Sequence, residues 1–393
     1  METEKVPTDP IKNLQPMRVL ETDDPIAQPK PGMALCLSGG GFRAMLFHLG
    51  VLWRLNEVGL MKGLARVSSV SGGSITAAQL GLMWKKLQFD SANIAGNLTE
   101  LVIDPIRGLA GISADQGAII WGTLLPGKTI ADEVAQQYRE HLYGNATLQD
   151  LPSDEEGPRF VINATNVQTK VLWRFSRPFM GDYRVGLIPN PRLELAVAVA
   201  ASSAFPPFLS PVSIKLNPAD FNPLTKGDLQ FEPYTSDVVL TDGGVYDNLG
   251  LETALKDCET ILVSDGGGSI LDEPTPKRDQ LDHMYRVLRL LDSQVRSLRK
   301  RQVIDSYRLG LRKGTYWGIR SNILDYKLPT AMNCPFDRTQ ELANTATRLK
   351  KLDKTLQEQI INWGYAVCDA AIRTHLDQTL KPPSSFPYTD SDV

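Results

Sequence analysis

Short apolar segments alternate with helical segments along most of the chain, and this alternation limits the possible folds more than any other feature. Five segments have the length and composition of buried strands: 33–37, 65–70, 160–167, 238–242 and 260–265. Between them, residues 45–59 and 74–87 carry apolar side chains at helical spacing. A β-α-β-α order is typical of a mostly parallel sheet flanked by helices. The sequence therefore predicts an α/β fold.

The segments outside this alternation differ in composition. Residues 1–32 carry six prolines and several acidic residues, so we expect an extended or disordered leader. Residues 90–150 interrupt the alternation. Within them, 117–127 is an apolar, glycine-bounded segment that fits a core loop or helix, or a flap over an apolar pocket. Residues 345–376 are again helical, and the proline-rich residues 381–393 predict a frayed tail.

Charge and cysteine usage exclude several classes of protein. A net charge of −3 over 393 residues gives no strong field that would attract nucleic acid. The four cysteines lack C-x-x-C spacing, which argues against zinc and disulfides and fits a reducing cytoplasm. The N-terminal residues lack the features of a signal peptide, and the apolar run 193–208 is too short and interrupted to span a membrane. We expect a cytoplasmic protein whose membrane contact is at most peripheral.

Three consecutive glycines, Gly39, Gly40 and Gly41, lie directly between the first predicted strand and the first predicted helix. Glycine allows a tight turn that brings N–H groups close to a ligand, and the following helix directs its positive end to the same place. Such a loop can hold a phosphate or an oxyanion. With Ala44 it also fits the dinucleotide pattern G-x-G-x-x-G/A, but that interpretation requires an acidic residue at the end of the next strand. The next strand ends in VSSVSGGS, which argues against a dinucleotide site.

Ser71 lies where the second predicted strand gives way to a helix, in the sequence SVSGG. This is one residue away from the nucleophile elbow G-x-S-x-G, whose sharp turn crowds the positions two before and two after the serine. Gly73 meets that demand fully, and Ser69 meets it with one additional hydroxymethyl group. The N–H of Gly72 would then face a substrate carbonyl oxygen. Alternatively, Ser71 is a helix N-cap without catalytic function.

Two aspartates lie at strand ends before glycines, Asp242 and Asp265, and the local pattern does not distinguish them. Each fits either a catalytic carboxylate at the edge of an α/β sheet or a structural turn residue. The four histidines of the chain are His48, His141, His283 and His375. A serine nucleophile would use either a histidine, with His283 or His375 following the aspartate in hydrolase order, or an aspartate as its base.

Taken together, SGGGFRA at 38–44, SVSGG at 69–73 and DGG at 242–244 resemble the signature motifs of the patatin-like phospholipase family. That family combines a glycine-rich oxyanion loop, a nucleophile elbow about 30 residues later and a distant D-G-[AG]. Two positions depart from its pattern. Ser69 replaces the first glycine of the elbow, and Ala44 replaces the last glycine of the oxyanion motif. Both substitutes are small.

Two further segments extend the resemblance. AVAASSAFPPFLSPV at 198–212 is similar to the family's A-x-x-A-S-x-A-x-P segment, and DGGVYDNLGL at 242–251 is similar to its continuation past the catalytic aspartate. The second similarity favours Asp242 over Asp265. The resemblance covers roughly residues 33–270, and the helical remainder is less specifically similar to bacterial members.

The resemblance implies a three-layer fold with a mostly parallel central sheet. It implies a catalytic domain at 33–270, with 90–150 as a helical and loop insertion, and a helical extension at 271–380 packed on the core. The implied activity is a lipid acyl hydrolase, of the phospholipase A or lysophospholipase type, without metal or cofactor. In that scheme Ser71 attacks the ester carbonyl, Asp242 accepts its proton, and water releases the fatty acid from an acyl-enzyme.

The resemblance also implies an oxyanion hole. The backbone N–H groups of Gly39, Gly40 and Gly41, with that of Gly72, would bind the negatively charged oxygen. Arg43 either adds positive charge nearby or has a structural function.

Two other functions fit the motifs: a serine esterase or thioesterase with a histidine triad, and a catalytically silent lipid-binding scaffold. The segment 283–313 holds nine Lys/Arg against two Asp, with arginines at near-helical spacing beside apolar residues. It predicts an amphipathic helix that is either solvated or in contact with anionic lipid. Nucleic-acid binding is not indicated, because the rest of the chain is mildly acidic.

Overall fold

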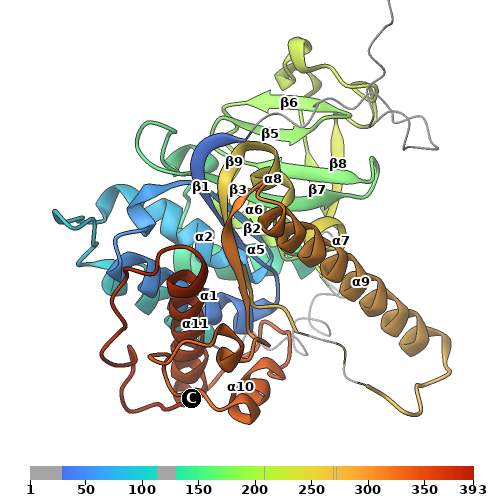
Figure 1. Cartoon of the computed structure of the whole chain (residues 1–393). Coiled ribbons are helices and arrows are strands. Elements are labelled where there is room, and N and C mark those ends of the chain that lie inside the picture. The colour runs from blue at the N-terminus through green and yellow to red at the C-terminus, as the bar shows by residue number, and fades with distance from the viewer. Residues whose placement is uncertain (1–28, 113–129, 208, 269, 271) are drawn as a thin grey trace, which may run out of the picture.

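The computed structural model describes residues 29–112, 130–207, 209–268, 270 and 272–393. In these residues ten strands form one sheet at the centre of the molecule (Figure 1). The strands are β1 (Lys30–Leu37), β2 (Leu64–Val70), β3 (Arg159–Asn166), β4 (Val171–Phe175), β5 (Phe179–Asp182), β6 (Gly186–Pro189), β7 (Val212–Lys215), β8 (Asp237–Asp242), β9 (Cys258–Asp265) and β10 (Lys313–Gly318). Their order is β10-β9-β1-β2-β3-β4-β5-β6, and β8 pairs with β3 and β7.

Strands of both directions meet in this sheet. The five strands from β10 to β3 are parallel, and β4, β5 and β6 continue antiparallel from β3. The pairs β3–β8 and β7–β8 are also antiparallel. The predicted α/β fold is confirmed, and the five predicted strands correspond to β1, β2, β3, β8 and β9. The other five strands were not predicted.

Helices cover both faces of the sheet. The α-helices of the described residues are α1 (Gly41–Glu57), α2 (Gly72–Met83), α3 (Asp104–Ala110), α5 (Ile130–Tyr138), α6 (Leu195–Ser202), α7 (Gly244–Asp247), α8 (Glu252–Asp257), α9 (Gln280–Arg308), α10 (Phe336–Ala343) and α11 (Lys354–His375). Leu35 and Leu37 of β1 belong to a large core that includes α1, α2 and α11. The alternating residues Ala34 and Cys36 belong to a second core with α8 and the end of α9. This alternation is that of a strand buried on both faces, so the molecule has three layers.

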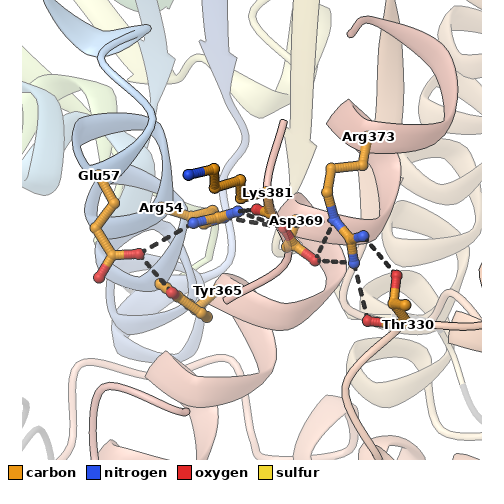
Figure 2. A network of polar contacts seen from close by, with 7 residues as sticks. All are labelled: Arg54, Glu57, Thr330, Tyr365, Asp369, Arg373 and Lys381. Atoms are coloured by element: carbon orange, nitrogen blue, oxygen red, sulfur yellow. Dashed lines mark hydrogen bonds and ion pairs between the residues drawn. The ribbon is translucent and has the colours of Figure 1, made fainter. Parts of the chain in front are cut away.

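A buried ionic network holds α11 against α1 (Figure 2). The carboxylate of Asp369 is fully buried and accepts hydrogen bonds from Arg54 Nε at 2.9 Å and from Arg373 Nη2 at 2.7 Å. Arg54 Nη2 also donates to the carbonyl oxygen of Lys381 at 2.6 Å. Because a buried charge is tolerated only when it is paired, this network fixes the position of α11 and of the residues that follow it.

The prediction of a frayed tail at 381–393 is wrong. Asn362 of α11 donates hydrogen bonds to the carbonyl oxygens of Tyr388 at 2.8 Å and Ser391 at 2.7 Å. The guanidinium of Arg107 lies 4.4 Å from the centre of the Tyr388 ring. Tyr388 and the buried side-chain amide of Asn362 hold the tail on the core, although the proline content of the tail suggests disorder.

The other predicted segments differ from the structure in their limits. Strand β1 begins at Lys30, three residues inside the predicted leader. Residues 1–28 of that leader, and the apolar segment 117–127, lie outside the described residues. The predicted helical extension contributes β10 to the sheet as well as helices. Among the residues that the structure describes, no helix has the length and apolar character needed to cross a membrane.

Candidate active site

Ser71 lies in the turn between β2 and α2 with a strained backbone, φ 52° and ψ −122°. A positive φ is uncommon for a residue other than glycine, and strained backbone conformations cluster at functional sites. Its side chain makes no capping hydrogen bond to α2, although it holds the N-cap position. The backbone N–H of Ser71 donates a hydrogen bond to Ser202 Oγ at 2.9 Å. The geometry therefore favours a nucleophile elbow over a simple helix cap.

The two glycines after Ser71 are required by close packing. A Cβ on Gly72 would overlap the carbonyl oxygen of Gly41, and a Cβ on Gly73 would overlap that of Leu37. These contacts bring the first turns of α1 and α2 together beside the serine. The pattern S-G-G therefore reflects the meeting of two helix N-termini.

Ser69, which replaces a motif glycine, is accommodated by hydrogen bonds. Its hydroxyl is buried, donates to the carbonyl oxygen of Val161 at 3.3 Å and accepts from Ser74 Oγ at 3.0 Å. Ser74 Oγ also lies 2.9 Å from Ser202 Oγ, which accepts the N–H of Ser71. Ser69 is thus one end of a chain of hydroxyl groups that supports the turn.

The register of the sheet brings Asp242 to Ser71. Strand β2 pairs in parallel with the first part of β3 and ends with Val70 opposite Asn163. Strand β8 pairs antiparallel with the last part of β3 and ends with Asp242 opposite Ala164. Since β4 occupies the other edge of β3, the carboxyl ends of β2 and β8 meet head-on along one edge. Ser71 follows directly after that meeting point.

The Asp242 carboxylate is in a strongly desolvated environment. Only 2% of the residue is exposed, Oδ1 accepts the N–H of Gly244 at 2.7 Å, and the side chain of Ser71 lies close enough to influence its ionisation. Burial raises the pKa of Asp242 to about 7; the N–H of Gly244 and the Ser71 side chain oppose this shift, and the charge of Asp292 adds to it. A carboxylate with this pKa is a far better base at neutral pH than a solvated one.

Asp265, the other candidate, is engaged in structural contacts. Its Oδ1 accepts the N–H of Gly267 at 2.9 Å, and its Oδ2 accepts the hydroxyl of Tyr316 at 2.7 Å. The guanidinium of Arg296 lies 3.9 Å away. These contacts tie the end of β9 to β10 and α9.

The histidines lie elsewhere. His48 is fully buried: Nε2 lies 2.9 Å from the carbonyl oxygen of Ser38, and Nδ1 lies 2.8 Å from Ser264 Oγ. Because a carbonyl only accepts, Nε2 carries the proton and Nδ1 accepts from the serine. Burial lowers the pKa of His48 to about 4, so the ring is neutral and joins the ends of β1 and β9. All four histidines are within the described residues, and no hydrogen bond found there links one to Ser71 or Asp242.

The predicted oxyanion glycines divide into two groups. Gly41 and Gly72 are the first residues of α1 and α2, where N–H groups have no intrahelical acceptor. Gly39 lies against Ser71, since a Cβ there would be 3.1 Å from Ser71 Cβ. However, its N–H donates to Asn248, with both O and Oδ1 at 3.1 Å. The prediction that Gly39 binds the oxyanion is therefore corrected: its N–H is used to hold the loop.

Gly40 completes the loop with φ 146°, a conformation that favours glycine. Arg43, two residues after Gly41, is only 2% exposed. Its guanidinium donates to the carbonyl oxygens of Gly266, at 3.2 Å, and Thr345. Burial, with the nearby charges of other arginines, lowers the pKa of Arg43 to about 10. Of the two functions considered for Arg43, these contacts favour the structural one.

The family model of the patatin-like phospholipases matches residues 35–255, more than half of the chain. This chain belongs to the patatin-like phospholipase family. The resemblance inferred from its motifs is confirmed. A comparison with curated proteins found no match.

Solved structures of distant relatives are similar to this patatin-like chain. Human GIVD cytosolic phospholipase A2 with methyl γ-linolenyl fluorophosphonate is 15% identical, with a TM-score of 0.47 over 86% of this chain and 57% of that one. A second structure of the human enzyme, also 15% identical, has a TM-score of 0.39 over 63% and 49%. VipD from Legionella pneumophila is 16% identical, with a TM-score of 0.30 over 80% and 67%. The chain spans about half the length of the phospholipase A2 chains that it matches.

Two residues of this patatin-like site were not predicted from the sequence. Ser202 holds the backbone of Ser71, and Asn248 holds that of Gly39. Both lie in segments that resemble the family pattern, 198–212 and 242–251. The signal was present, but only the folded chain brings these polar side chains to the loops that hold Ser71 and Gly39.

Proposed function

We propose that this chain is a lipid acyl hydrolase of the phospholipase A or lysophospholipase type that uses a Ser71–Asp242 dyad. One observation carries the proposal: a serine with a strained backbone lies beside a buried carboxylate whose pKa is raised to about 7. Membership in the patatin-like phospholipase family supports a lipid ester as the substrate.

In the proposed reaction, Asp242 accepts the Ser71 proton while the serine oxygen attacks the ester carbonyl. The tetrahedral intermediate collapses when the carboxyl of Asp242 returns the proton to the leaving alcohol, and this leaves an acyl-serine. Asp242 then deprotonates a water molecule that attacks the acyl group, which releases the fatty acid and regenerates Ser71.

The N–H groups of Gly40, Gly41 and Gly72 are the proposed oxyanion donors. Two of them begin helices, so the helix dipoles add positive potential at the developing charge. Each such donor typically contributes about 3 kcal/mol of transition-state stabilisation. Burial of Asp242 serves the same step, because a dry site raises the basicity of a carboxylate toward that needed to activate an alcohol.

A chromogenic fatty-acyl ester assay tests the dyad. We expect Ser71→Ala and Asp242→Asn each to abolish turnover, while His283→Ala and His375→Ala retain it. An essential histidine would replace the dyad with a triad. A wild-type chain that hydrolyses none of a varied set of lipid esters would identify a silent scaffold, and turnover by Ser71→Ala would refute the proposal.

A further inference from the structure

His48 is a fully buried polar residue to which the proposed reaction gives no role. It lies two turns into α1, seven residues after Gly41. Because helical side chains tilt toward the N-terminus of their helix, the imidazole reaches back toward the end of β1. There its Nε2–H donates to the carbonyl oxygen of Ser38 at 2.9 Å. The ring is thus bound to the residue that directly precedes the glycine loop.

The carbonyl oxygen of Ser38 joins this loop to the turn that holds Ser71. It accepts the N–H of Gly73 at 3.2 Å as well as the Nε2–H of His48. Gly73 is the second residue of α2 and follows Ser71 by two residues. A carbonyl oxygen has two lone pairs, so these two donors occupy both of them. His48 therefore completes the contact between the segments that lead into α1 and α2.

The other polar groups of Ser38 are also bound. Its N–H donates to the carbonyl oxygen of Ser264 at 3.1 Å, and its Oγ accepts the N–H of Gly266 at 2.8 Å. The same hydroxyl donates to the carbonyl oxygen of Gly39 at 3.2 Å. On the other side of the imidazole, Ser264 Oγ donates to Nδ1 of His48 at 2.8 Å. Ser38 is therefore a fixed point at the carboxyl ends of β1 and β9.

This fixed point matters for the two loop residues proposed as oxyanion donors. Gly40 and Gly41 follow Ser38 by two and three residues and have φ values of 146° and 62°. Their own conformational freedom is large, so the residues that anchor the loop must set the direction of their N–H groups. Oxyanion donors act because they are held in place before the charge develops, and a small displacement lowers the rate.

The two ring nitrogens of His48 have distinct functions that side-chain amides can separate. Burial lowers the pKa of His48 to about 4, so near neutral pH the ring donates at Nε2 and accepts at Nδ1. A glutamine amide is separated from Cβ by as many bonds as Nε2, so it can still donate to Ser38. An asparagine amide extends only as far as Nδ1, so it can accept from Ser264 but does not reach Ser38.

We propose that His48 is a positioning residue for the reaction: its Nε2–H fixes the Ser38 carbonyl and thereby the direction of the oxyanion donors that follow. This inference rests on the proposed function, since it concerns the proposed oxyanion hole. His48 itself transfers no proton to or from the substrate. In the described part of the chain, the hydrogen bonds of its two nitrogens go to Ser38 and Ser264.

Kinetics of two variants on a soluble short-chain ester test the proposal. For His48→Asn we expect kcat to fall about 100-fold with little change in KM, because the oxyanion donors are displaced. His48→Gln should stay within about tenfold of the parent and keep its pH profile. An amide accepts no proton at neutral pH, so rescue by glutamine also distinguishes positioning from a histidine base. Equal kcat values in the two variants, whether high or low, would overturn the proposal.

Hydrogen exchange of the Gly73 amide tests the same bond without turnover. In His48→Asn the Ser38 carbonyl loses one donor and is no longer fixed, so the Gly73 N–H should exchange at least about tenfold faster than in the parent. In His48→Gln its exchange should match the parent. Peptides of α11, which packs against α1, are the internal control and should exchange at the parental rate in both variants.

The two measurements separate this inference from the proposed function. If the parent hydrolyses no ester, the proposed function fails, while exchange at Gly73 still decides whether His48 fixes the Ser38 carbonyl. Unchanged exchange at Gly73 in His48→Asn would overturn the inference. Faster exchange that extends through α11 would overturn it as well, because His48 would then stabilise the fold as a whole.

Discussion

Replacement of Asp242 by asparagine is expected to stabilise the folded chain above neutral pH while it removes the proposed base. Folding raises the pKa of this carboxyl from 3.8 to about 7. Since one pKa unit corresponds to 1.36 kcal/mol, the ionised carboxylate destabilises the folded state by about 4 kcal/mol above its folded pKa. The amide is uncharged, similar in shape, and keeps an oxygen to accept the N–H of Gly244.

The sign of this effect depends on pH. Below the ordinary value of 3.8 the carboxyl is protonated in both the folded and unfolded chain, so ionisation contributes nothing to the difference between wild type and variant. As pH rises toward the folded pKa, the unfolded chain loses its proton first, and the wild type becomes progressively less stable than the variant. Between pH 5 and pH 8 the stability advantage of Asp242→Asn should grow by about 3 kcal/mol.

Urea unfolding followed by tryptophan fluorescence at these two pH values measures the change. Ser71→Ala is the matched control: it also inactivates the proposed dyad but keeps the carboxyl, so its stability should fall with rising pH at least as much as that of the wild type, because the Ser71 side chain holds the pKa of Asp242 down. An advantage of Asp242→Asn that is equal at both pH values would refute the argument, because the carboxyl would then not titrate differently in the folded chain.

Three other outcomes are expected. On a soluble ester, kcat/KM should rise about tenfold per pH unit below pH 7 and level off above it, because the base must be ionised; a profile that levels off near pH 4 would contradict this. Ser202→Ala removes the acceptor of the Ser71 N–H and should lower kcat about 10- to 100-fold with little change in KM, and Ser202→Thr should restore much of the loss. Asp369→Ala leaves two buried arginines without their shared carboxylate and should lower the free energy of unfolding by about 3–5 kcal/mol in urea denaturation.

The longer apolar strands could be predicted from the sequence, and the short strands β4 to β7 and the edge strand β10 could not. Segments such as 33–37 and 260–265 contain runs of apolar residues. Such a run indicates a buried strand from the local sequence alone. Strands β5, β6 and β7 have only four residues each, and β6 ends in a proline. Such strands exist because a neighbouring strand offers hydrogen bonds, and a segment of four residues does not reveal that pairing by its own composition.

The two residues of the proposed dyad could also be predicted, but the reason for their proximity could not. Motif resemblance pointed to Ser71 and Asp242 as residues at strand ends, in a sheet expected to be mostly parallel. In the structure they are neighbours because an antiparallel strand meets a parallel one along a single edge of β3. The direction of β8 depends on pairing across many residues, which a local pattern does not specify.

The two departures from the family pattern, Ala44 and Ser69, are explained by the residues that surround them in the structure. Ala44 fits because its side chain lies between backbone segments: a Cβ on Gly40 would be 2.9 Å from the Ala44 Cβ, and one on Gly266 would be 2.7 Å away. Ser69 fits for a different reason, since its hydroxyl has both a donor and an acceptor within the buried turn. A hydroxyl buried without partners would destabilise the turn, whereas this one joins the group that reaches the backbone of Ser71. The serine at position 69 therefore supports the turn that holds Ser71, the proposed nucleophile.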